Sequence, residues 1–489
     1  MQASKPATPQ EGGEKIEVGV VQESVQDNIL KADLSEDDGE VFKSHTGVAE
    51  FRTLGWYETL LTSQQHGDDS LTQTWKTRIR AGIILMKLCF ATGVLGIPYA
   101  LNVTGYGPGI CILFGWGSMT TYYAYIMYLF RMKYRGVHNI ADAAAIMGGP
   151  VAREVAGGLF LLTWILAAGS GFIGLAQGLK ILADGKACTV VWTVVAAICT
   201  GLVSSIRTLD KLAVLTWVGF ASIFTAVFIV VVGVTQVSRP AAAPKTGPFD
   251  LGVIAVGSPG FVAGLTATLN LFSGYGATPT FMPVIAEMRR PKSYPKALFS
   301  SQGALSVCYI TFGTVVYVYC GQYVASPSLA SAGGKIEKIA FGISIPGFIM
   351  TSTLWVHMAA KFLFVKILRN SPHLQSNSLI HWSTWLGSTL GITLLSFIVA
   401  EAIPFFSFLL GLIGSLCCAP TCLVIPAFMG LYMDRGNHGA NWRKKAVCSL
   451  HFAVIALGSF ITVAGTYTTI KSIVDAYNDG TVGGAFSCA

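Results

Sequence analysis

The amino-acid sequence predicts an all-α protein that crosses a lipid bilayer many times, and three observations carry this prediction. Of the 489 residues, 52% are hydrophobic and only 12% are charged, whereas a soluble domain carries about 25% charged residues. Mean hydropathy is +0.58. Apolar runs of about 20 residues, the length that spans the hydrocarbon core, recur from residue 81 onwards.

The two ends of the chain differ from this apolar middle. Residues 1–50 contain 11 Asp and Glu but only 4 Lys and Arg, which gives a net charge of −7. Because the whole chain carries +8, residues 51–489 carry +15. An acidic segment such as residues 1–50 cannot bury enough apolar surface to fold, and it lacks a signal-peptide core. We expect a disordered cytoplasmic tail over 1–50, a cytoplasmic lead-in over 51–80, the transmembrane domain over 81–475 and an extracellular or lumenal tail over 476–489.

Eleven segments of the middle region are long and apolar enough to be transmembrane helices. We place them at 81–103, 107–130, 155–180, 188–206, 212–236, 259–286, 298–320, 339–364, 383–402, 404–431 and 447–470. With a cytoplasmic amino terminus, 20 Lys and Arg fall in inner loops and 7 in outer loops. Positive residues favour the cytoplasmic side, so this orientation is predicted, with the carboxyl terminus outside.

Two of the eleven spans contain residues that interrupt helices. They are Gly93, Gly96 and Pro98 in span one, and Gly274, Gly276, Pro279 and Pro283 in span six. Glycine is permissive and proline removes a backbone donor. A single such residue is usually a packing contact or a kink, which is the alternative interpretation of either span alone.

The spacing of these spans favours interruption, because one and six are equivalent members of two five-helix halves. Broken helices at matching positions indicate the binding site of a secondary transporter. Free N–H groups at a half-helix N-terminus suit a carboxylate, and freed carbonyls suit an ammonium or a cation. A site with both ends is shaped for an amino acid.

Three separated motifs carry a family resemblance. GVLGIPYA at 93–100, EMRRPKSYPKA at 287–297 and IPFFSFLLGLIGS at 403–415 resemble the amino acid/auxin permease (AAAP) family, and FRTLGWYE at 51–58 is similar to the lead-in of its fungal neutral amino-acid permeases. The resemblance implies eleven transmembrane helices, a five-plus-five inverted-repeat core of the LeuT-like (APC) type with broken helices one and six, and a substrate held between spans one, three, six and eight.

The same resemblance implies a substrate site at six positions. They are Thr92, Gly93 and Val94, whose backbone N–H groups would meet the carboxylate, and Phe272, Ser273 and Tyr275, which would line the span-six side. The chain departs from the family pattern at Ala277, Pro283 and Ser293-Tyr294. These departures bear on substrate preference more than on fold.

Lys87 is the one charged residue near the middle of a predicted span. A central lysine costs about 3 kcal/mol, so we expect it to face the protein interior. The resemblance implies asparagine here in sodium-coupled members and lysine in proton-coupled ones. An ammonium can replace a sodium ion, and a desolvated one can release a proton. The alternative is that Lys87 snorkels to the cytoplasmic surface.

Several other polar residues are weaker candidates. Thr351, Ser352 and Thr353 in span eight and Glu287 after span six are candidates for ion coupling, and His357 is a candidate proton relay. Ordinary helix back-bonding and an interfacial ion pair are the alternatives. Glu401 is expected to be a solvated helix end. Cys188 and Cys320 could form an outer disulfide, whereas most cysteines are expected to be small core residues.

The predicted function is a proton-coupled symporter that carries neutral amino acids, with bulky or aromatic ones among the candidates. Its expected partners are the amino acid, protons and the bilayer, with no nucleic acid, cofactor or metal. The alternatives are an amino-acid sensor that signals through its N-terminal tail, and a vacuolar exporter. No catalytic or phosphate-binding motif indicates an enzyme. The plasma membrane is favoured over the vacuolar membrane.

Overall fold

The computed structural model describes residues 81–90, 92–206, 209–288, 291–369, 371–374, 378–436, 441–480, 486 and 488. Side chains at 209–216, 286 and 287 are outside this description. Within it the chain is helical and has no β-strand. The predicted tail 1–50 and lead-in 51–80 lie outside the described residues.

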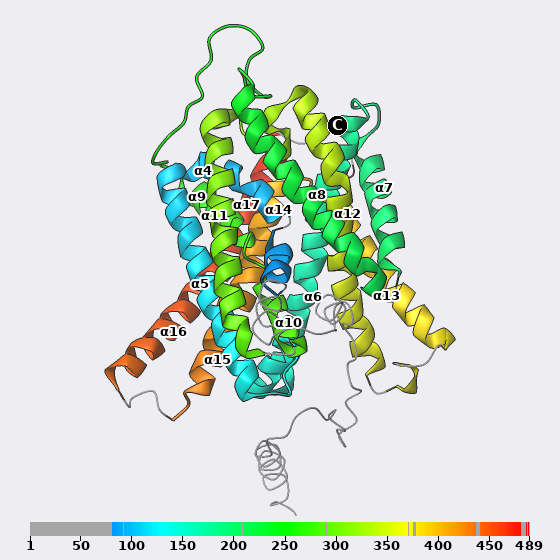
Figure 1. Ribbon diagram of the computed structural model, residues 1–489, viewed down its shortest axis with the longest axis vertical. Coiled ribbons are helices and arrows are strands. Elements are labelled where there is room, and N and C mark those ends of the chain that lie inside the picture. Colours follow the sequence, from blue (N-terminus) through cyan, green and yellow to red (C-terminus); the bar gives the residue numbers. More distant parts are fainter. Residues whose placement is uncertain are drawn as a thin grey trace, which may run out of the picture. The chain divides into compact units, whose positions relative to one another are not determined.

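The described helices pack together as a bundle (Figure 1). In order they are Ala81–Cys89, η1 Gly93–Gly96, α4 Ile97–Thr104, α5 Tyr106–Lys133, α6 Ile140–Leu182, α7 Thr189–Ser204, α8 Leu209–Gln236, α9 Phe261–Ser273, η2 Thr278–Thr280, α10 Phe281–Glu287, η3 Pro291–Ser293, α11 Tyr294–Cys320, η4 Gly321–Tyr323, η5 Ser328–Ala332, α12 Gly334–Leu368, η6 Pro372–Leu374, α13 Leu379–Ala402, α14 Phe406–Leu412, η7 Ile413–Val424, α15 Ile425–Met433, α16 Trp442–Phe460, η8 Ile461–Gly465 and α17 Thr466–Asn478. Two of these, η7 and η8, are π-helices.

Helix occupies each of the eleven ranges that the sequence predicts. Among the described residues, seven helical segments are by themselves long and apolar enough to cross a membrane, and the bent pair Ala81–Cys89 and Gly93–Thr104 makes an eighth. α7 has only 16 residues, and the sixth range is divided between α9 and α10. The all-helical fold is as expected, while eleven crossings and the inverted repeat stay predictions.

α6 begins at Ile140, well before the predicted start at 155. Its first part is a separate short helix that Asn139 caps by accepting a hydrogen bond from the Asp142 N–H. The axis then kinks at Gly148 and Gly149, where Gly149 has φ of 71°, a backbone conformation that glycine adopts at low cost. The transmembrane part therefore restarts after the kink, which explains the different boundary.

α6 and α12 pack closely because glycines on α6 accept side chains from α12. A Cβ added at Gly174 would lie 2.5 Å from the Phe348 ring, and one added at Gly171 would lie 2.1 Å from the Ser352 hydroxyl. Small residues allow such close approach between membrane helices. Spans three and eight thus form one packed unit beside the interrupted helices.

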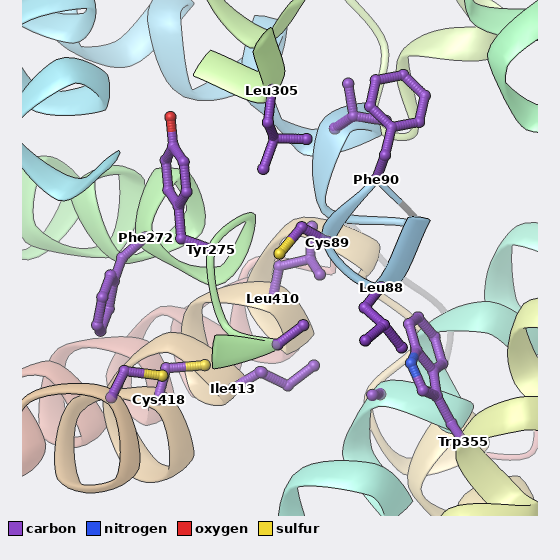
Figure 2. Close-up of a cluster of buried hydrophobic side chains, with 14 of the residues drawn as sticks. Leu88, Cys89, Phe90, Phe272, Tyr275, Leu305, Trp355, Leu410, Ile413 and Cys418 are labelled. Carbon is purple, nitrogen blue, oxygen red and sulfur yellow. The ribbon is translucent and has the colours of Figure 1, made fainter. Parts of the chain in front are cut away.

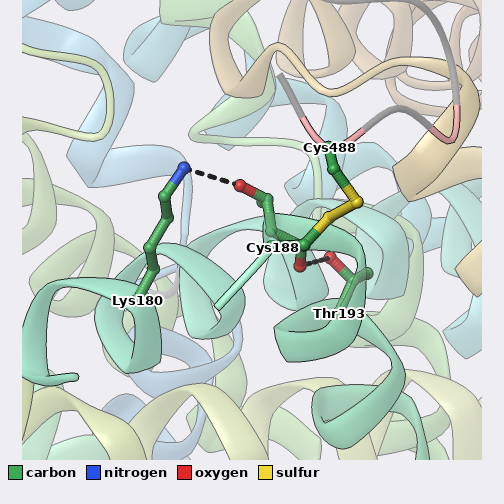
Figure 3. Close-up of a disulfide and its surroundings, with 5 residues drawn as sticks. Lys180, Cys188, Thr193 and Cys488 are labelled. Atoms are coloured by element: carbon green, nitrogen blue, oxygen red, sulfur yellow. Dashed lines mark hydrogen bonds between the residues drawn. A yellow bond between two sulfur atoms is a disulfide. The ribbon is translucent and has the colours of Figure 1, made fainter. Parts of the chain in front are cut away.

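A disulfide joins the loop before α7 to the carboxyl-terminal tail. Cys188 is bonded to Cys488, 300 residues further on, and Lys180 donates a hydrogen bond to Thr189 beside it, at 2.8 Å (Figure 3). The proposed Cys188–Cys320 pair is therefore wrong. Cys320 is a buried free thiol at the end of α11, where the helix packing encloses it.

Candidate functional site

The first interruption divides span one into two helical halves. The first half ends at Cys89, and the chain resumes as a turn of 3-10 helix from Gly93 and then as α4. The two halves are bent by 45°. Pro98 occupies the first turn of α4, where its missing N–H leaves no hydrogen bond unmade. Gly96, the residue before α4, is its N-cap.

The second interruption lies in span six. α9 ends at Ser273, Gly274 is its C-cap, and α10 begins only at Phe281. Pro279 lies in the short 3-10 turn between them. Main-chain carbonyls around such a gap lose their helical partners, which is tolerated at membrane depth only where protein or a cavity surrounds the gap.

The two interruptions are in direct contact with each other. A Cβ added at Gly93 would lie 2.7 Å from the Gly274 Cα, closer than a real Cβ contact allows. The contact is therefore backbone against backbone, and it requires glycine on the span-one side. Figure 2 shows Cys89, Tyr275 and Leu410, which come from three segments, in one cluster of buried side chains.

Three side chains tie these gaps to the surrounding helices. The Tyr309 hydroxyl of α11 lies 2.8 Å from the Cys89 carbonyl oxygen and 2.9 Å from that of Gly274. The Thr92 and Ser170 hydroxyl oxygens are 3.3 Å apart, which links span one to α6. Tyr309 and Ser170 could not be predicted as partners, because nothing in one sequence marks which residue of a distant helix faces a gap.

The predicted substrate residues on span six are occupied by protein contacts. Phe272 and Tyr275 are fully buried. The Phe272 ring packs against Trp116 of α5 with centroids 4.4 Å apart, and the Tyr275 hydroxyl is 3.0 Å from that of Ser306. These contacts position the α9 end of the gap against α5 and α11.

The smaller predicted residues lie at the gaps themselves. Thr92 and Val94 are buried on either side of Gly93. Ser273 is half-buried, and its hydroxyl donates to the Asn270 carbonyl of its own helix. The Thr92 and Ser273 carbonyls accept hydrogen bonds from the Leu95 and Gly276 N–H groups, so local turns of the chain surround both gaps.

Lys87 lies inside the protein, with 7% of its surface exposed. Its Nζ is 5.2 Å from the centre of the Trp217 ring on α8, a distance at which an ammonium and an aromatic face attract each other. The contact explains how a cation is accommodated at this depth. Trp217 was not singled out from the sequence, although a tryptophan in span five was visible there.

The other ion-coupling candidates are distributed on different elements. Ser352 is buried against Gly171, and Thr351 beside it is half-buried. Glu287 is the last residue of α10, and its side chain is outside the described part. Thr353, which follows Ser352 on α12, is also buried.

Two ionisable residues have environments that differ from a solvated surface. Glu401 lies within α13 and is 6% exposed, so the expectation of a solvated helix end is wrong. The carboxyl-terminal helix α17 packs over this end of α13, where Tyr477 donates a hydrogen bond to the Ala402 carbonyl at 2.9 Å. His357 is buried with its ring against Trp385, centroids 4.9 Å apart. A relay role for His357 stays a prediction.

The π-helix η7 in span ten also borders the second interruption. A Cβ at Gly276 would lie 2.4 Å from the Cys418 sulfur, and the Cys422 thiol is 3.7 Å from the Gly276 carbonyl oxygen. π-Helices occur frequently at functional sites. The residues of this span do not distinguish the distortion from an ordinary α-helix.

Long apolar helices around two interrupted helices that touch define a multi-pass membrane transporter. The family model for transmembrane amino acid transporter proteins matches residues 75–471. The chain belongs to this family, the amino acid/auxin permease family, whose members are transporters and not enzymes.

Named relatives agree with this assignment. A transmembrane transporter of Gibberella moniliformis is 39% identical over 92% of this chain and 90% of its own length. The N amino acid transport system protein of Neurospora crassa is 28% identical over 85% and 88%. Amino acid transporter AVT3B of Arabidopsis thaliana is 25% identical over 78% and 90%.

A solved transporter structure shares the fold. Mhp1, a nucleobase-cation-symport-1 family transporter in a closed conformation with bromovinylhydantoin bound, aligns with a TM-score of 0.50 at 13% identity. The alignment covers 82% of this chain and 92% of that one. This likeness concerns the fold alone.

Proposed function

We propose that the protein is a proton-coupled symporter that moves neutral amino acids across the plasma membrane. The observation that carries the proposal is the backbone contact between Gly93 and Gly274 in a chain of the amino acid transporter family. Around this contact, N–H groups follow Gly93 at the start of the second half of span one, and carbonyls end the first half of each span. Such a pair of ends is complementary to a zwitterion.

Proton coupling rests on Lys87. A fixed ammonium, held against Trp217, supplies a positive charge at the depth where a sodium ion would otherwise be needed. The driving force is then the proton gradient together with the membrane potential, which contributes about 2.3 kcal/mol per charge at 100 mV. Neutral amino acids are favoured as cargo because the buried residues around the gaps, such as Phe272, are mainly apolar.

The disulfide supports the proposed orientation. Disulfides persist in oxidising compartments, and Cys188 and Cys488 both lie on the side that the charge distribution assigns to the exterior. Figure 1 shows the marked carboxyl end beside the start of α7. This arrangement supports the proposed cytoplasmic amino terminus and external carboxyl terminus.

Uptake of a labelled neutral amino acid in oocytes tests the proposal. We expect saturable uptake and inward current in choline medium, with both increasing as external pH falls. Lys87→Met should abolish the pH response. Lys133→Met is the matched control, since that exposed lysine donates to the Met433 carbonyl and lies over the Tyr134 ring, and it contacts neither interruption in the described residues. Uptake that requires sodium and ignores external pH would refute the proposal.

A further inference from the structure

Tyr309 lies between the two interruptions and contacts the main chain of both. It is fully buried within α11, and its hydroxyl oxygen is 2.8 Å from the Cys89 carbonyl oxygen and 2.9 Å from that of Gly274. Cys89 ends the first half of span one, and Gly274 caps the first half of span six. One O–H group therefore faces two carbonyls whose helices have ended.

The Tyr309 ring is held so that its hydroxyl stays at this point. Phe90 stacks on it with centroids 6.0 Å apart, and Tyr275 meets it edge-on at 5.4 Å. A Cβ added at Gly274 would come within 3.2 Å of a Tyr309 ring carbon. Residues from both interrupted spans thus fix the same side chain.

Converging main-chain carbonyls at helix breaks are the ligands that discontinuous transporter helices offer to a coupling cation. In this protein the position between the Cys89 and Gly274 carbonyls is filled by a covalently attached donor. A shared hydrogen bond satisfies both oxygens, which would otherwise be costly at this depth.

We propose that the Tyr309 hydroxyl is a built-in substitute for a monovalent cation at this point. It holds the two interruptions together without sodium, through hydrogen bonds that involve neither Lys87 nor Trp217. The inference rests on the proposed function, since it names the residue that makes a cation unnecessary between the two gaps. Tyr309 is a positioning residue and is not assigned a direct substrate contact.

The test compares Tyr309→Phe with Tyr294→Phe. Tyr294 is on the same helix and equally buried, but its hydroxyl has no hydrogen-bond partner within the described residues. At equal surface abundance in choline medium, Tyr309→Phe should transport at least about tenfold more slowly, because two buried carbonyls lose their donor. Adding sodium should restore transport in this variant and leave wild type and Tyr294→Phe unchanged.

Two outcomes would overturn the inference. One is a Tyr309→Phe variant that transports like Tyr294→Phe without sodium. The other is a loss that neither sodium, lithium nor potassium reverses. If Tyr309→Phe does not reach the surface, thermal unfolding of purified wild type decides instead: a higher Tm in sodium chloride than in choline chloride would show that the position is open to the ion.

The same unfolding measurement, made on Tyr309→Phe, should reveal a Tm increase with sodium that wild type lacks. It needs neither a substrate nor a proton gradient. Failure of amino-acid uptake would therefore count against the proposed function, whereas failure of sodium stabilisation in the variant would count against the role of Tyr309.

Discussion

The interrupted helices and the α6–α12 pair both depend on glycine, but glycine contacts side chains in the α6–α12 pair and main chain at the interruptions. In α6, Gly171 and Gly174 receive the Ser352 and Phe348 side chains. At the interruptions, Gly93 meets the main chain of Gly274 and no side chain stands between them. The first contact fills space, and the second brings polar backbone together.

The difference shows how one bundle can contain both a densely packed wall, formed by α6 and α12, and a polar region, formed by the two interruptions. Side chain packed against glycine gives dense apolar contact that favours a single arrangement. Backbone packed against backbone brings polar N–H and C=O groups together, and Tyr309 satisfies two of these carbonyls. Substitutions in the two regions should therefore fail in different ways.

The largest effect is expected for Gly93→Val. Its side chain would displace Gly274 backbone that cannot rotate away, and overpacking of this kind costs about 1–3 kcal/mol. We expect transport to fall by about 100-fold at equal surface abundance, which corresponds to the upper end of that range. Initial uptake rates normalised to biotinylated surface protein provide the measurement.

Gly115→Ala is the matched control for this change. Within the part of the chain that the structure describes, no atom lies within 4 Å of a Cβ added at Gly115 of α5, and glycine is a poorer helix former than alanine. Its uptake should equal that of wild type. Normal transport by Gly93→Val would mean that the two interruptions do not need to touch.

A smaller and different effect is expected for Gly174→Val on α6. The new side chain would press on the Phe348 ring, which costs about 1–3 kcal/mol and should lower Tm by several degrees together with the surface amount. The KM of the protein that does reach the surface should stay near the wild-type value. Gly158→Ala, at an open position on the same helix, should leave Tm unchanged. A raised KM with normal Tm would remove the distinction between wall and site.

The helical fold could be predicted without knowledge of side-chain contacts, because it depends mainly on the length and the apolar content of each run. Length and apolar content of each run determine where helix can cross a membrane, and helix occupies all eleven predicted ranges. The start of α6 could not be placed, because the kink at Gly149 depends on a φ of 71° that a sequence does not state. The pairing of Cys188 with Cys488 needed the path of the tail.

The chain positions of the two interruptions could be predicted from the sequence, but the residues that contact them could not. Glycine and proline change backbone behaviour wherever they occur, so the gaps at Gly93 and Gly274 were visible in the residues. The partners were not: Tyr309 and Trp217 resemble many other aromatic residues until distant helices come together. Glu401 misled for the same reason, since its burial depends on a helix about 70 residues later.

The smallest effect concerns the hydrogen bond that joins the two regions. Ser170 of α6 donates to the Ala167 carbonyl at 2.7 Å, so Thr92 of span one is the donor in their 3.3 Å contact. Ser170→Ala leaves the Thr92 hydroxyl without this acceptor, which costs about 0.5–1.5 kcal/mol. Because Thr92 adjoins the gap, KM should rise about two- to tenfold with little change in Vmax.

Ser344→Ala separates this effect from loss of any buried hydroxyl. Ser344 of α12 is equally buried and, among the described residues, donates only to the Phe341 carbonyl of its own helix, so the KM of this variant should stay at the wild-type value. Concentration series of a labelled neutral amino acid on both variants give the comparison. Equal KM values would mean that the wall and the interrupted helices are coupled through packing alone, because the hydroxyl contact between them would then contribute nothing to substrate affinity.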